Sequence, residues 1–166
     1  MSHTDSSVAV STNVASEPAP SFTDGRIWKW ISGLVACFWV FSCWSEAFVV
    51  LGIKSGTLKG QDVLGPNYET LQPLIEQTPL WTPINTAVAG LLYLIAAVCI
   101  FRRRAIAGAF FTGGFVLTLG QQLIAIQDAA YRQSLSVGHL VWDVVLFAVT
   151  GLLAVLLLRK FLSRRA

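Results

Sequence analysis

The sequence is poor in charged residues: Asp, Glu, Lys and Arg make up 13% of its 166 residues, whereas hydrophobic residues make up 54%. A soluble domain ordinarily carries about 25% charged residues. The mean hydropathy of +0.62 points in the same direction. This shortage of polar surface excludes an ordinary soluble domain and predicts an integral membrane protein, with the lipid bilayer as its first partner.

The sequence also lacks the motifs of common catalytic and cofactor sites. It contains no GxSxG, P-loop, GxGxxG, HExxH or CxxC pattern, and such patterns carry the nucleophiles, phosphate cradles and metal ligands of many enzymes. His139 is the one histidine within an apolar stretch, which excludes bis-histidine haem ligation by this chain. We therefore expect no cofactor and no metal site, and a non-enzymatic role is favoured. Basic residues stand at the ends of apolar stretches rather than on one surface, so no nucleic-acid partner is expected.

Four apolar segments are each long enough to cross the hydrocarbon core, which takes about 20 helical residues. They cover approximately residues 27–53, 83–101, 105–127 and 137–158. Residues 1–25, which precede them, are rich in Ser, Thr, Ala and Pro and predict a disordered cytoplasmic tail. The fold expected for residues 26–166 is therefore an all-α, integral membrane four-helix bundle.

The basic residues predict how these segments are oriented. With four spans, nine of the twelve Lys and Arg residues fall on the side of the two termini and three on the other side. Because cytoplasmic loops are enriched in Lys and Arg, we expect both termini in the cytoplasm, in a bacterial inner (plasma) membrane. The connection of residues 54–82 then lies outside, either as a plain loop or as a short kinked helix on the outer surface.

Polar residues inside the segments gather at one depth. Counting along each segment places Glu46, Gln121 and Asp143 roughly 6 to 9 Å from the midplane, on the outer side. Hydrocarbon cannot satisfy a carboxylate, which costs roughly 3 kcal/mol or more there, so both acids should face the bundle interior. We expect a ligand-binding layer made of Glu46, Gln121, His139 and Asp143, with Tyr93 near its floor and Asn85 and Asp128 at its outer rim.

The sequence alone leaves an alternative open for each of these assignments. Glu46 can instead reach the outer interface, or pair with Gln121 as a protonated acid that only fixes helix packing. Asp143 and His139 can form a solvated rim, and Tyr93 can serve packing alone. The two acids and His139 are also ligand types that suit Mn, Fe or Zn, although their spacing matches no metal motif.

Three classes of function follow from these patterns. The first is binding or transport of a small molecule, a cation or a proton by the polar layer. The alternative is a non-catalytic accessory or assembly subunit of a larger membrane complex, and the third is a membrane enzyme with outward-facing acid and base residues. Four helices are few to enclose a transport pathway, but a homo-oligomer would supply more helices to line one. A stripe of small residues on the third segment would permit it by close helix packing: Ala105, Ala109, Gly113 and Gly120.

Overall fold

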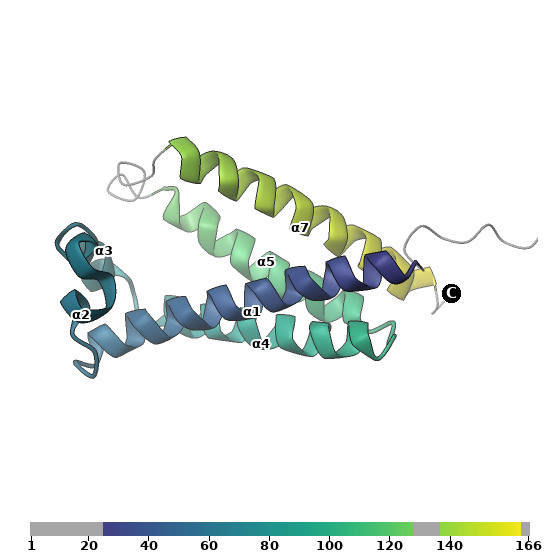
Figure 1. Ribbon diagram of the computed structural model, residues 1–166, viewed down its shortest axis with the longest axis horizontal. Coiled ribbons are helices and arrows are strands. Elements are labelled where there is room, and N and C mark those ends of the chain that lie inside the picture. The colour runs from purple at the N-terminus through teal and green to yellow at the C-terminus, as the bar shows by residue number, and fades with distance from the viewer. Residues whose placement is uncertain (1–24, 128–136, 164–166) are drawn as a thin grey trace, which may run out of the picture.

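The computed structural model describes residues 25–127 and 137–163, and all regular elements within these ranges are helices (Figure 1). The long helices are α1 (Arg26–Lys54), α4 (Trp81–Phe101), α5 (Ala107–Ala125) and α7 (Val137–Ser163). All four are long and apolar enough to cross a membrane. The expected all-α fold with four such helices is thereby confirmed for the described part of the chain.

The ends of the long helices depart slightly from the apolar segments. α7 continues to Ser163, past residue 158, because Arg159 and Lys160 are good helix formers and positive charge is favourable near a helix C-terminus. α5 begins at Ala107 because the turn that follows α4 occupies residues 102–106. Arg103 in this turn has a φ of +54°, the left-handed conformation that commonly ends a helix.

The connection between α1 and α4 is itself largely helical. It contains α2 (Gly60–Leu64), the short 3-10 helix η2 (Gly65–Asn67) and α3 (Tyr68–Gln77). Pro73 lies inside α3, whose apolar and polar residues alternate at helical spacing. The connection is tied to the end of α1, where Lys54 Nζ donates a hydrogen bond to the Glu76 carbonyl oxygen at 3.0 Å. Of the two alternatives for residues 54–82, the structure has the helical one.

The long helices pack in chain order as antiparallel neighbours, α1 against α4, α4 against α5 and α5 against α7. We call one end of the bundle the basic end, because it carries Lys29, residues 102–104 and Lys160. The opposite end, which carries α2 and α3, is called the α3 end. Figure 1 shows that α7 diverges from α1 toward the α3 end, so the bundle is tighter in its middle than at that end.

Small residues of α5 set how closely the helices approach. A Cβ atom at Gly108 would lie 2.3 Å from the Leu157 carbonyl oxygen of α7, and one at Gly114 would lie 3.1 Å from a ring of α4. A Cβ atom at Gly120 would meet nothing within 4 Å, and one at Gly113 would touch a single methyl group at 3.4 Å. The close-packed face of α5 therefore contains Gly108 and Gly114 rather than the stripe that runs through Gly113 and Gly120.

An aromatic cluster near the middle of the bundle brings all four long helices together. Tyr93 of α4 is fully buried and stacks on Trp39 of α1, with ring centroids 5.8 Å apart. Phe111 of α5 meets Tyr93 edge-on at 5.4 Å, and Phe147 of α7 lies 5.3 Å from Trp39. Such contacts matter in an apolar solvent, because helix association there depends on close packing rather than on removing apolar surface from water.

Candidate functional site

One buried hydrogen bond ties α1 to α7. Trp39 Nε1 donates to Thr150 Oγ1 at 2.9 Å, and Thr150 Oγ1 donates in turn to the Leu146 carbonyl oxygen at 2.7 Å. An indole N–H in an apolar interior needs an acceptor, because leaving it unpaired costs about 1–3 kcal/mol. α1 and α7 otherwise contact one another sparsely. This bond and the adjacent contact between Trp39 and Phe147 therefore set the register of the two helices.

This register brings the two acids of the apolar segments to one level. Glu46 follows Trp39 by seven residues in α1, and Asp143 precedes Thr150 by seven residues in α7. Seven residues are nearly two helical turns, about 10.5 Å along the axis and only about 20° away around it. Because α1 and α7 run in opposite directions, both steps lead toward the α3 end. Glu46 and Asp143 thus lie at one height, on the helix sides that form the Trp39–Thr150 contact.

α1 and α7 diverge toward the α3 end (Figure 1), and both acids lie on that side of the Trp39–Thr150 hydrogen bond. Trp39 and Thr150 are buried, whereas Glu46 is exposed and Asp143 is half-buried. The nearby Cys43 is buried against α4, so Glu46 stands at the edge of the packed face of α1, on the side toward α7. In the described part of the chain no hydrogen bond joins the two carboxylates. We call this level, defined by Glu46 and Asp143, the acidic level.

Gln121 is occupied in the contact between α4 and α5. Its Nε2 donates to the Thr82 carbonyl oxygen at 2.9 Å, and its Oε1 accepts a hydrogen bond from Thr86 Oγ1 at 3.3 Å. Both ends of the amide are therefore paired with the first turns of α4. Gln121 holds these two helices together, where the sequence pattern had grouped it with Glu46.

Gln122, the next residue, lies on the side of α5 that faces α7. Phe115, seven residues earlier, approaches Gly151 of α7 so closely that a Cβ atom there would lie 3.0 Å from its ring. α5 and α7 are antiparallel, so the same register continued by two turns toward the α3 end sets Gln122 opposite Val144, the residue next to Asp143. Gln122, which the sequence pattern did not include in the ligand-binding layer, therefore lies near the height of Asp143.

Tyr93 lies below the acidic level as part of its floor. Its hydroxyl and Thr118 Oγ1 form a buried hydrogen bond of 3.2 Å, and Thr118 Oγ1 also donates to the Gly114 carbonyl oxygen at 3.1 Å. The Tyr93 ring stacks on Trp39, which in turn contacts Phe147. With its hydroxyl paired and its ring buried, Tyr93 provides the shape of an aromatic floor.

The other candidate residues contribute less to the geometry. Asn85 is half-buried in the first turns of α4. His139 belongs to α7, but its side chain is outside the described structure, and Asp128 lies outside the described residues altogether. Within residues 25–127 and 137–163, no group of three or more His, Cys, Asp and Glu side chains is placed to hold a metal ion.

Thr86 and Thr118 are buried polar residues that reasoning from the sequence missed. Thr86, Thr118 and Thr150 each donate to the carbonyl oxygen four residues earlier, and each also bonds to a side chain of a neighbouring helix. The sequence did contain a signal for them. Hydroxyl side chains within apolar helices ordinarily form hydrogen bonds with the backbone or with a neighbouring helix.

The fold and its polar contacts are compatible with a multi-pass membrane protein. Four of the described helices are long and apolar enough to span a bilayer. Across the described residues, every buried side-chain nitrogen or oxygen has a hydrogen-bond partner, as an apolar surrounding requires. Comparisons with protein-family models, with curated proteins and with solved structures find no match for this chain.

Proposed function

We propose that this chain is a multi-pass membrane protein that binds a small organic cation at the acidic level. The observation that carries the proposal is the Trp39–Thr150 hydrogen bond, from which we infer that Glu46 and Asp143 lie at a common height on the sides of α1 and α7 that form this contact. In this proposal both termini lie in the cytoplasm, because most Lys and Arg residues belong to the basic end. The acidic level then opens to the outer side of the membrane.

A cation would offset the cost of holding two acids at one level of an apolar bundle. The described basic residues lie toward the two ends of the bundle, and the nearest along α1, Lys54, is held by the Glu76 carbonyl oxygen. Phe147, the half-buried member of the aromatic cluster, would contact the hydrocarbon part of a ligand in this proposal. These features favour an organic cation over an inorganic one. We propose binding rather than transport, because four helices are few to enclose a transport pathway.

The test is the binding of tetraphenylphosphonium to the full-length chain in neutral detergent, measured by isothermal titration calorimetry. Glu46→Gln and Asp143→Asn keep the side-chain shape and remove the charge, and each should raise the Kd at least about tenfold, which is about 1.4 kcal/mol. Glu69→Gln is the matched control, because Glu69 is an exposed carboxylate in α3, away from the acidic level. This control should stay within about twofold of the wild-type Kd.

Two results would defeat the proposal. If Glu46→Gln and Asp143→Asn both retain the wild-type Kd, the acids do not bind the cation. If Glu69→Gln weakens binding as much as they do, the attraction is a general effect of surface charge.

The exposure of Glu46 favours a second candidate, an accessory subunit whose partner covers this edge of α1. A carboxylate at the edge of an apolar helix would form an interhelical hydrogen bond with such a partner. Extraction in a mild detergent would then recover a stoichiometric partner protein, and Glu46→Gln would reduce that recovery severalfold. Recovery unaffected by Glu46→Gln would argue against this role for the acid.

A further inference from the structure

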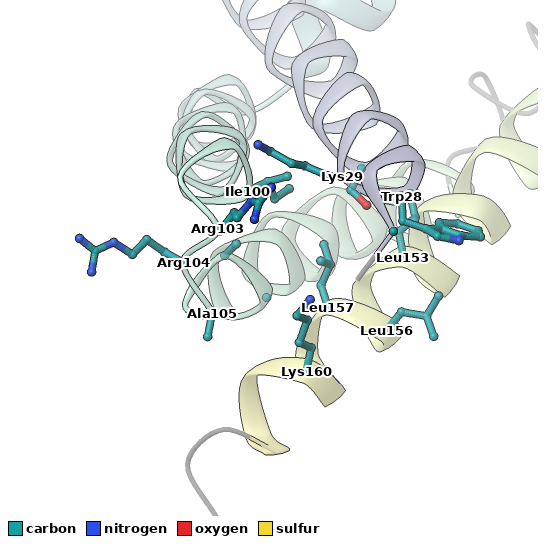
Figure 2. Close-up of a pocket in the computed structure, with 14 residues that line it drawn as sticks. Trp28, Lys29, Ile100, Arg103, Arg104, Ala105, Leu153, Leu156, Leu157 and Lys160 are labelled. Atoms are coloured by element: carbon teal, nitrogen blue, oxygen red, sulfur yellow. The ribbon is translucent and has the colours of Figure 1, made fainter. Parts of the chain in front are cut away.

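A cavity of about 420 Å³ opens at the basic end, between the first turns of α1, the turn from α4 to α5 and the last turns of α7 (Figure 2). Its volume falls within the range of small-molecule sites, about 300–1,000 Å³. The cavity lies at the opposite end of the bundle from the acidic level, and the proposed cation site does not use any of its residues. It is therefore a separate candidate site.

Small side chains create this space. Ser32 of α1 and Ala107 and Gly108 of α5 line the cavity and are buried. At Gly108 the helices already touch, since a Cβ atom there would lie 2.3 Å from the Leu157 carbonyl oxygen. The backbones thus meet at one point while the small side chains around it leave an opening. The cavity is built by the packing of three elements rather than by a loose surface loop.

The charges that line the cavity are all positive. Its charged lining residues are Lys29, Arg103, Arg104 and Lys160, and no Asp or Glu is among the described residues that line it. Figure 2 shows that they come from three different elements and that Arg104 extends away from the cavity. Lys29 Nζ lies 5.8 Å from the centre of the Phe101 ring. Cations gathered around a partly enclosed space create a positive potential, which an anion would neutralise.

Arg103 is held in a conformation that suits glycine better than arginine. Its φ is +54°, and its N–H donates to the Ile100 carbonyl oxygen at 3.0 Å while the next N–H, of Arg104, donates to the Cys99 carbonyl oxygen at 2.8 Å. Glycine is the usual residue at this place in a helix C-cap. An arginine here weakens the cap and adds a guanidinium to the cavity. A side chain kept at a strained position points to a function for that side chain.

One side of the cavity is apolar. Trp28 of α1 and Leu156 and Leu157 of α7 line it, and Figure 2 shows Trp28 and Leu156 on the side away from Arg103 and Arg104. A ligand that fits this cavity therefore has an anionic group and an attached hydrocarbon chain. Phospholipids of the cytoplasmic leaflet have this chemistry, and basic pockets between helices on that side of a membrane bind their headgroups.

We propose that this cavity binds one anionic phospholipid, with its phosphate between Lys29 and Arg103 and its acyl chain along the apolar side of the cavity. The basic end faces the cytoplasm in the orientation that positive charge favours, and the anionic lipids of a plasma membrane are found in that leaflet. The proposal depends on membrane insertion with this orientation. It does not depend on cation binding at the acidic level.

The experiment measures the binding of dioctanoyl phosphatidylglycerol, dioctanoyl phosphatidylcholine and inorganic phosphate to the full-length chain in neutral detergent. Phosphatidylglycerol should bind at least about tenfold more tightly than phosphatidylcholine, and Arg103→Gln should raise its Kd by a similar factor. Arg102→Gln is the matched control, because Arg102 belongs to the same turn and carries the same charge but does not line the cavity. It should leave the Kd within about twofold of wild type.

Arg103→Gly separates a lost ligand contact from a damaged fold. Glycine accepts the positive φ freely, so this variant should weaken phosphatidylglycerol binding about tenfold while its Tm stays equal to or above that of the wild type. Glu46→Gln should not change lipid binding, which keeps this test independent of the cation site.

Several outcomes would overturn the lipid site. Equal affinity for the two phospholipids would remove the role of charge, and wild-type affinity in Arg103→Gly would remove the role of Arg103. If Arg102→Gln weakens phosphatidylglycerol binding as much as Arg103→Gln does, the affinity comes from the general positive charge of the basic end. Inorganic phosphate that binds as tightly as phosphatidylglycerol would show a site for free phosphate instead of a lipid site.

Discussion

Replacing Gly108 with alanine should force α5 and α7 apart. A Cβ atom at this position would lie 2.3 Å from the Leu157 carbonyl oxygen and 2.6 Å from its carbonyl carbon. Ordinary van der Waals contact begins at 3.4 Å, so the two helices must separate locally by about 1 Å. The obstacle is backbone, so no side-chain rotation relieves the clash. Overfilling a tightly packed contact costs about 1–3 kcal/mol, and the loss of stability should fall in this range.

Thermal unfolding of the full-length chain in neutral detergent, followed by circular dichroism, measures this loss. For a chain of this length, about 1 kcal/mol corresponds to a shift in Tm of roughly 2–4 °C, so Gly108→Ala should lower the Tm by several degrees. Gly120→Ala is the matched control in the same helix, because a Cβ atom there meets nothing within 4 Å. Alanine is favoured over glycine in a helix by about 0.5–1 kcal/mol, so this control should raise the Tm slightly.

The opposite pattern would refute the packing face assigned to α5. If Gly120→Ala lowers the Tm and Gly108→Ala leaves it unchanged, the face through Gly113 and Gly120 is the one that packs closely. The stripe expected from the sequence would then carry the helix contact or a contact between copies of the chain.

Further variants test individual contacts. Thr150→Val keeps the shape of the side chain but removes the acceptor of Trp39 Nε1; in an SDS unfolding titration it should cost about 1–2 kcal/mol, and Thr150→Ser, which keeps the hydroxyl, should cost less. Gln121→Leu removes the hydrogen bond from Thr86 and should lower the Tm by a few degrees, yet tetraphenylphosphonium binding should stay within about twofold of wild type if the amide serves only packing. Arg103→Gly should stabilise the chain by roughly 1 kcal/mol, because its φ of +54° is strained for arginine; a clear fall in Tm would contradict this.

The helical architecture was accessible from the sequence because its causes are local. Long apolar runs need internal hydrogen bonding wherever they are buried, and a helix satisfies it within one segment. For the connection of residues 54–82 the sequence allowed both a loop and a kinked helix, since Pro73 stands within a short amphipathic pattern. There the structure has a helix, α3, in which Pro73 removes one backbone hydrogen bond, and α3 packs on the end of α1.

The site was only partly accessible for a geometric reason. Consecutive helical residues point about 100° apart, so choosing between Gln121 and Gln122 requires knowing which neighbour each side of α5 faces. Gln121 turned out to bond with α4, and Gln122 lies toward α7. The common depth of Glu46 and Asp143 could be counted along the chain, and an inward orientation was expected from the cost of a carboxylate in hydrocarbon. The hydrogen bond between α1 and α7 that relates the two helices at this level appears only in the structure.

The sequence by itself determined the number of apolar helices, their approximate ends and the concentration of positive charge at one end of the bundle, because hydropathy and charge count depend on local composition. Only the tertiary structure decided what those features build. Along the chain the basic residues indicate orientation, and four of them line one cavity because the first turns of α1, the turn after α4 and the last turns of α7 meet there. Likewise Gly108, not Gly113, became the point of closest approach, since helix faces acquire a role only when a neighbouring backbone packs against them.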